Sequence, residues 1–158
     1  MGEPAVIKSF WQQYLASLPE TEKPRTSTYD FGIFGDTEDD AETCALLVKA
    51  GIKTATSALI WEYEAENQKL PVPGDISIVT GRDGVPHCII ELTECEVKPF
   101  NAVDEHFAFD YGEWDRTLAS WRTGNWEYFS GVCKMLARPP SDTMPLICQR
   151  FRVLYPKD

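Results

Sequence analysis

A dipeptide near the middle of the chain places the strongest limit on what it can fold into. Asp83-Gly84 lies between two apolar stretches, at 76–79 and 87–93, an arrangement typical of the turn of a β-hairpin. Other stretches with the composition of strands lie at 53–60, 95–100 and 146–155. No crossover helix separates the central strands, which disfavours a doubly wound parallel sheet. We expect an α+β fold in which an antiparallel or mixed sheet forms a small PUA-like β-barrel with flanking helices.

Helices are expected on both sides of these strands. Apolar residues repeat at helical spacing over 7–18 and over 39–50, and Gly51 is placed to form a left-handed C-terminal cap. A loop or short helix is expected over 61–69. The region 103–129 is expected to be helical in pieces, with breaks at Gly112 and Gly124.

The length of 158 residues favours a single domain with one hydrophobic core. We expect residues 1–28 to form an N-terminal helix and a loop, the loop over 19–27, and residues 29–155 to form the core. Five cysteines, an odd number without close pairs, indicate reduced and mostly buried thiols.

The charge balance limits the possible partners. Lys and Arg number 15 against 25 Asp and Glu, a net charge of −10, so we expect no binding to long duplex nucleic acid through charge. No apolar run is long enough to span a membrane and no signal peptide is recognisable, so a cytoplasmic location is expected. With two histidines and no Cys-x-x-Cys pair, we expect no metal site, and no phosphate-binding glycine motif suggests a cofactor.

The segment 51–57, Gly-Ile-Lys-Thr-Ala-Thr-Ser, is the first candidate site. In a regular strand Lys53 and Thr56 would point to opposite faces, whereas a turn at Gly51 would let them converge. A desolvated lysine there could act as a base toward a hydroxyl. A charged lysine could instead hold a phosphate or a carbonyl oxygen. The alternative is a solvated loop lysine beside strand-forming threonines.

The second candidate site is the segment 110–126, which combines carboxylates, arginines and tryptophans. Carboxylates such as those of Glu113 and Asp115 can accept hydrogen bonds from base amino groups or transfer protons. Aromatic side chains can stack on a nucleobase. The alternative is a capped helix start with charged surface residues, in which the tryptophans fill the core.

Together these segments resemble the ASCH-domain family, which is related to the PUA fold. The resemblance covers about residues 29–155 and depends on an ordered set of motifs: Gly51-x-Lys53-Thr-x-Thr56, Pro73-Gly74-Asp75, Gly112-Glu-Trp-Asp115, Trp121-Arg122, Tyr128-Phe129 and Phe151-x-Val153. At three positions the chain departs from the usual pattern of similar members: Tyr111 stands for a glutamate, Trp114 stands for a glycine, and Ala58 is the third. Ala58 stands where an arginine often closes the lysine motif.

The resemblance implies a cleft that receives RNA or a nucleoside. Some family members are described as ribonucleases, and a small bacterial member is an amidohydrolase that acts on acetylated cytidine. By motif match, the catalytic lysine and threonine of that amidohydrolase correspond to Lys53 and Thr56. Its glutamate corresponds to Asp110, Tyr111 or Glu113.

Three functions follow from these features. In the first, the chain binds a nucleoside or short RNA: Lys53 polarises the ligand, Glu113 and Asp115 accept hydrogen bonds, and further contacts come from Thr54, Trp61, Trp121, Arg122 and Trp126. In the second, it is a metal-independent amidohydrolase or ribonuclease in which Lys53 is the base, Thr56 the nucleophile or its positioner, and Glu113 the proton carrier. In the third, it is an acidic protein-interaction module. Proximity of Lys53 to the carboxylates of 110–115 would favour the first two.

Overall fold

The computed structural model describes residues 3–24, 28–35 and 37–157, which divide into two compact units. Unit 1 contains Met1–Gly51, Asp75–Glu91 and Arg152–Asp158, and unit 2 contains Ile52–Gly74 and Leu92–Phe151. The chain therefore contributes several separate segments to each unit. The single domain over 1–158 stays a prediction. Residues 25–27, at the end of the expected loop, lie outside the described residues.

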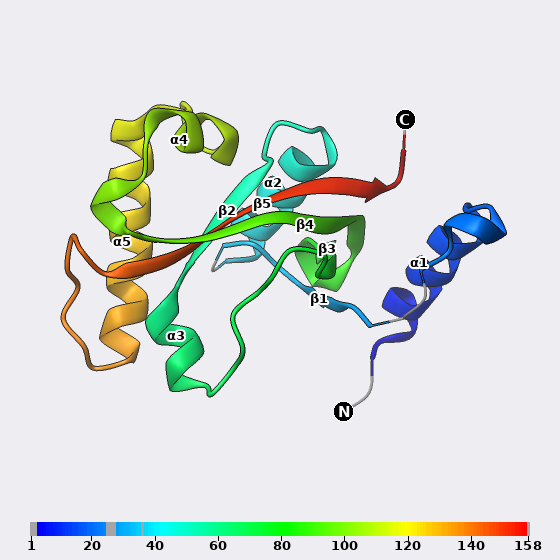
Figure 1. Cartoon of the computed structure of the whole chain (residues 1–158), viewed down its shortest axis with the longest axis horizontal. Coiled ribbons are helices and arrows are strands. Elements are labelled where there is room, and N and C mark those ends of the chain that lie inside the picture. The colour runs from blue at the N-terminus through cyan, green and yellow to red at the C-terminus, as the bar shows by residue number, and fades with distance from the viewer. Residues whose placement is uncertain (1–2, 25–27, 36, 158) are drawn as a thin grey trace. The chain divides into compact units, whose positions relative to one another are not determined.

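Within the described residues, five strands are hydrogen bonded in the order β1-β3-β4-β5-β2 (Figure 1). Their bounds are Asp30–Gly32 for β1, Ala55–Leu59 for β2, Ile76–Thr80 for β3, Pro86–Pro99 for β4 and Pro145–Tyr155 for β5. β1 is parallel to β3, whereas the pairs β3–β4 and β2–β5 are antiparallel. The sheet is therefore mixed, and with the helices it confirms the expected α+β class.

Unit 1 packs a helix against the hairpin half of the sheet. α1 (Ala5–Ala16) follows the predicted helical repeat and buries one stripe of side chains. That stripe shares a core cluster with side chains of β3 and β4: Ile7, Trp11, Tyr14, Ile78 and Ile89. The short 3-10 helix η1 (Glu20–Glu22) follows α1.

α2 (Glu38–Lys49), also in unit 1, has the termini that its sequence suggests. The Thr37 hydroxyl accepts a hydrogen bond from the Asp40 N–H at 3.1 Å and so caps the first turn. Gly51, just after the helix, has a φ of +78°, which confirms the left-handed position expected there.

The predicted hairpin joins β3 to β4. Asp83 and Gly84 have φ values of 59° and 73° in the single turn η2 (Arg82–Gly84). Such positive values are what an Asp-Gly turn provides. The resulting register places Ile78 opposite Ile89, and both side chains are buried.

Unit 2 contains the two candidate segments. Its helices are α3 (Ile60–Ala65), η3 (Phe100–Ala102), α4 (Glu105–Tyr111) and α5 (Leu118–Met135). α4 lies beside the first turns of α5 (Figure 1). Aromatic and aliphatic side chains from β2, α4, α5 and β5 form one core cluster, which includes Leu59, Phe107, Trp121, Phe129 and Leu146.

Two predicted boundaries are wrong. The strands expected at 87–93 and 95–100 are one strand, β4, because the exposed polar side chains near Glu94 do not interrupt an extended backbone. The break expected at Gly124 is absent, since α5 continues through it. A glycine costs an α-helix only about 1 kcal/mol, which tertiary packing can offset. The break at Gly112 is confirmed, with a φ of +74° after α4.

Candidate functional site

Lys53 lies two residues before β2, and its side chain is 0% exposed. Backbone hydrogen bonds fix this part of the chain at the neighbouring Thr54. The Thr54 N–H donates to the Asp110 carbonyl at 2.8 Å, and the Thr54 carbonyl accepts from the Phe151 N–H at 3.1 Å. The Thr54 hydroxyl also donates to the Asp110 carbonyl, at 3.3 Å. Thr54 therefore joins the start of β2 to the end of α4.

The Lys53 amine has acceptors in three directions. Its Nζ lies 2.7 Å from Glu113 Oε2, 2.8 Å from the Ala55 carbonyl oxygen and 3.2 Å from the Tyr111 carbonyl oxygen. A lysine ammonium has three N–H donors, and a buried charge is retained when it is paired and hydrogen bonded. In this geometry the ammonium can use all three of its N–H groups as hydrogen-bond donors.

The ring of Tyr111 lies next to the same amine. Lys53 Nζ is 3.5 Å from the ring centroid, a cation–π contact. The Tyr111 hydroxyl is 3.2 Å from Ser57 Oγ and donates to Asn125 Oδ1 at 3.4 Å. Burial raises the pKa of Tyr111, and the nearby Glu113 carboxylate raises it further, while hydrogen bonds from Ser57 and Thr56 oppose the shift. The phenol is therefore neutral at neutral pH.

Gly112 brings Glu113 to Lys53. It is left-handed, and a Cβ atom on it would lie 2.7 Å from the Ile52 carbonyl oxygen and 2.8 Å from Lys53 Cα. The end of α4 can approach the segment before β2 this closely because glycine has no side chain. Glu113 follows immediately, and its side chain remains 22% exposed. The pair thus joins a fully buried side chain, Lys53, to a partly exposed one, Glu113.

The other carboxylates of the segment have different partners. Asp110 pairs with the Arg150 guanidinium at 2.5 Å. Asp115 accepts hydrogen bonds from the Thr117 N–H at 3.1 Å and the Thr117 hydroxyl at 2.6 Å, at the start of α5. Hydrogen bonds from Ser120 and Thr117 lower the pKa of Asp115. Of the carboxylates considered from sequence, the structure places Glu113 on Lys53.

Of the hydroxyl residues predicted near Lys53, Thr56 lies on β2 and Thr54 immediately precedes it. Thr56 is half-buried and reaches the Tyr111 hydroxyl, which links it to the ring beside the Lys53 amine. Thr56 thus belongs to the side chains gathered around Tyr111.

The predicted Arg122 is exposed on α5, three residues before the buried Asn125.

The three predicted stacking residues are spread over unit 2. Trp121 is 1% exposed and packs in the core against Phe100 and Tyr111, so no face of its ring is open. Trp61, on α3, carries the Arg138 guanidinium 3.7 Å above its ring. Trp126 is 38% exposed and meets Phe100 edge to face.

Sequence reasoning assigned no role of this kind to several residues of the site, although Ser57 lies in the first candidate segment and Tyr111 was one of three positions aligned with the family's glutamate. Ser57, Tyr111 and Asn125 form the hydrogen-bonded group beside Lys53, and Trp114 is 53% exposed immediately after Glu113. For Tyr111 and Trp114 there was a signal, since both depart from the usual pattern of similar family members. For Ser57 and Asn125 the contacts depend on how β2, α4 and α5 pack.

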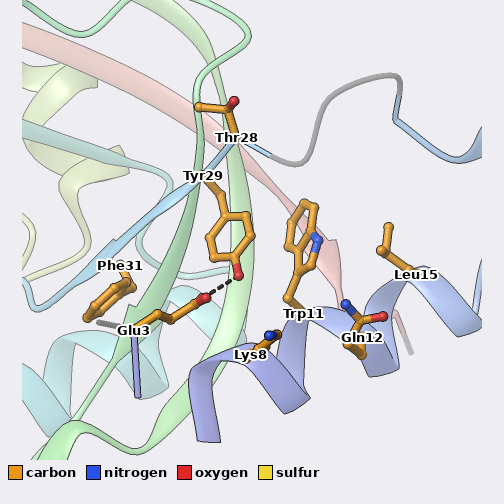
Figure 2. Close-up of a pocket in the computed structure, with 8 residues that line it drawn as sticks. All are labelled: Glu3, Lys8, Trp11, Gln12, Leu15, Thr28, Tyr29 and Phe31. Carbon is orange, nitrogen blue, oxygen red and sulfur yellow. Dashed lines mark hydrogen bonds between the residues drawn. The ribbon is translucent and has the colours of Figure 1, made fainter. Parts of the chain in front are cut away.

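A separate pocket lies in unit 1. Figure 2 shows it between α1 and the segment that leads into β1, with a volume of about 420 Å³. Trp11 and Tyr29 stack in its wall with ring centroids 4.3 Å apart. None of the residues predicted as a site lines this pocket. In the described part of the chain no cluster of His, Cys, Asp or Glu is suited to a metal ion, and no helix is long and apolar enough to cross a membrane.

Comparison with known proteins gives concordant matches. The family model of the ASCH domain matches residues 30–155. The chain is similar to the crystal structure of an ASCH domain from Lactobacillus crispatus, with 31% identity and a TM-score of 0.93 over 99% of this chain and 98% of that one. It is also similar to a protein from Enterococcus faecalis, with 29% identity and a TM-score of 0.82 over 94% of this chain and 87% of that one. None of the curated proteins compared with the chain matches it.

Proposed function

Because this chain belongs to the ASCH domain family, we propose that it binds the base of a nucleoside, or of an unpaired nucleotide in a short RNA, through the Lys53–Glu113 pair. In this role Glu113 accepts a hydrogen bond from an amino or imino group of the base. Lys53 holds the carboxylate in place.

The observation that carries the proposal is the asymmetry of the pair. The Lys53 side chain is 0% exposed and that of Glu113 is 22% exposed, while the charged atoms are 2.7 Å apart. A carboxylate fixed in this way on a partly exposed side chain is an oriented acceptor, and carboxylates accept from the exocyclic amino group of cytosine. Such charge-assisted hydrogen bonds are the stronger kind.

The net charge of −10 favours a base over a phosphate chain as the recognised group. Affinity for long nucleic acid comes mainly from phosphate neutralisation by cationic residues. Here the site's cation is already paired with Glu113. Recognition through the base does not require a free cation.

Calorimetric titration with cytidine, acetylcytidine and a cytidine-containing dinucleotide tests the proposal. We expect binding by the wild type, and a loss of about tenfold or more in affinity for Glu113→Gln, which removes the charge from the acceptor. Lys53→Met should also weaken binding, and Lys69→Met, an exposed lysine elsewhere in unit 2, is the control. Failure of the wild type to bind all three ligands, or unchanged affinity in a folded Glu113→Gln variant, would refute it.

A second function, amide hydrolysis, is favoured by one further observation. The hydroxyls of Thr56 and Ser57 meet at Tyr111, whose ring contacts the Lys53 amine. In this reaction the Thr56 oxygen bonds to the acyl carbon of an acetylated base, and the proton passes through Glu113 to the departing amine. Water then cleaves the acyl ester and releases acetate. Lys53 here polarises and does not accept the proton.

Chromatography of acetylcytidine after incubation with the protein tests this function, with a short RNA substrate as the ribonuclease arm. We expect turnover to be lost in Thr56→Ala and retained in Ser57→Ala if threonine is the nucleophile. No turnover by the wild type, or equal turnover in Thr56→Ala, would exclude the threonine mechanism.

A further inference from the structure

We infer that Trp114 is the side chain on which the bound base stacks, an inference that rests on the proposed function. Sequence reasoning placed this role on other tryptophans of unit 2. Four features favour Trp114 instead: its exposure, its backbone conformation, the packing of its ring on α5 and its position next to Glu113 in the chain.

Trp114 presents an open ring at a position that bulky residues avoid. It is 53% exposed, more than any other tryptophan of the chain, and its φ is +54°. A left-handed backbone is unfavourable for a residue with a large side chain, and such conformations occur where the surrounding structure imposes them, often at binding sites. A half-exposed indole in this conformation gains little from burial, which points to a use at the surface.

The Trp114 ring packs against α5 at Gly124. A Cβ atom placed on Gly124 would lie 2.1 Å from Cζ2 of the Trp114 ring. The indole therefore lies directly on the helix backbone, in space that any other residue at position 124 would occupy. Gly124 lies against the ring, and 53% of Trp114 stays exposed.

The contact between the Trp114 ring and Gly124 lies next to the Lys53 site. Tyr111, whose ring contacts the Lys53 amine, hydrogen bonds to Asn125, the residue after Gly124. Glu113, the residue before Trp114, pairs with Lys53. The segment from Tyr111 to Trp114 is thus fixed both at Lys53 and on one turn of α5, and its two partly exposed side chains, Glu113 and Trp114, are consecutive in the chain. A base bound edge-on at Glu113 can place its face against that ring.

The other tryptophans of unit 2 offer less. Trp121 is enclosed in the core, and Trp61 has a guanidinium over its ring. Trp126 is less exposed, at 38%, and its ring contacts Phe100. Trp114 is therefore the ring best placed to gain a stacking partner on binding.

Calorimetry and tryptophan fluorescence of single variants test the inference, with cytidine as the ligand. We expect Trp114→Ala to weaken binding by about tenfold, the scale of one base–aromatic stack. Trp114→Phe should keep most of the affinity and abolish the quenching of tryptophan emission by the ligand. Gly124→Ala keeps the tryptophan at position 114, but the added methyl group displaces its ring, so this variant should weaken binding similarly. Phe31→Ala, an exposed aromatic residue in unit 1, is the control and should bind as the wild type does.

The outcomes separate this inference from the proposed function. If the wild type binds cytidine and Glu113→Gln weakens binding while Trp114→Ala has no effect, the stacking role is refuted and the base-binding function stands. A loss confined to Trp126→Ala would assign stacking to that residue instead. Failure of the wild type to bind refutes both.

Discussion

Among single residues, Gly112 is subject to two steric demands at once. It combines a φ of +74° with a position where a Cβ atom would lie 2.7 Å from the Ile52 carbonyl oxygen. Gly84 has nearly the same backbone angle, +73°, but no atom lies within 4 Å of the place where its Cβ atom would be. A comparison of the two glycines therefore distinguishes the cost of backbone strain, which both positions share, from the cost of crowding, which only Gly112 has.

We expect Gly112→Ala to lower the free energy of unfolding by about 3 kcal/mol and Gly84→Ala by about 1 kcal/mol. Both substitutions strain a left-handed backbone, but only the first also forces the end of α4 away from Lys53. Urea denaturation of both variants measures the difference. Equal losses would contradict the close approach at Gly112.

The individual residues of the site were only partly predictable. Lys53, Thr56 and Glu113 were selected because a lysine, a hydroxyl and a carboxylate stand in an ordered motif. Ser57 and Asn125 were missed because their common contact, Tyr111, depends on which residues of β2 and α5 face the end of α4. Trp121 was assigned to the ligand although it fills the core, since an apolar stripe does not reveal which of its rings are enclosed.

At the level of elements, α5 carries two internal glycines with different surroundings. Gly124 lies under the Trp114 ring, whereas at Gly131 no atom lies within 4 Å of an added Cβ atom. The sequence predicted a break at Gly124 because it showed the glycine but not the ring that needs it. Where helical spacing and capping residues agreed, as in α1 and α2, the elements were predicted correctly.

We expect Gly131→Ala to raise the free energy of unfolding by about 0.5–1 kcal/mol, since alanine favours a helix more than glycine does. Gly124→Ala should lower it, because the added methyl group displaces the Trp114 ring. Thermal or urea unfolding of the two variants measures the signs. Stabilisation by both substitutions would show that the Trp114 ring does not pack firmly against α5.

The N-terminus of α4 predicts a pH dependence of stability. The Asp104 carboxylate accepts from the Phe107 N–H at 2.9 Å, and this hydrogen bond is the main reason that the pKa of Asp104 is lowered. Because the pKa of Asp104 is lower in the folded chain than in the unfolded chain, the carboxylate stabilises the fold at pH values above its unfolded pKa of about 4. That contribution is lost as the pH falls through the folded pKa.

Asp104→Asn keeps a capping oxygen that does not titrate, so we expect stability to fall less steeply below about pH 4. Urea denaturation across a pH series measures the slope. Glu64→Gln, at an exposed site, controls for the loss of one negative charge. An unchanged slope in Asp104→Asn would show that the cap does not contribute to the acid sensitivity.

At the level of the whole molecule, the charge of −10 sets the expected response to salt and RNA length. If recognition is through one base, lengthening the RNA to ~20 nucleotides should not raise affinity, and the dissociation constant for cytidine should change less than about twofold between about 50 and 200 mM salt. Fluorescence polarisation and calorimetry measure these trends. Affinity that rises with length and falls steeply with salt would indicate phosphate recognition instead.

The complete enclosure of the Lys53 amine also has a chemical consequence. Acylating reagents modify exposed lysines such as Lys69 on contact, but they reach Lys53 only when this region of unit 2 opens. The rate at which Lys53 is acylated, followed by mass spectrometry of its peptide, therefore measures how often this region of unit 2 opens.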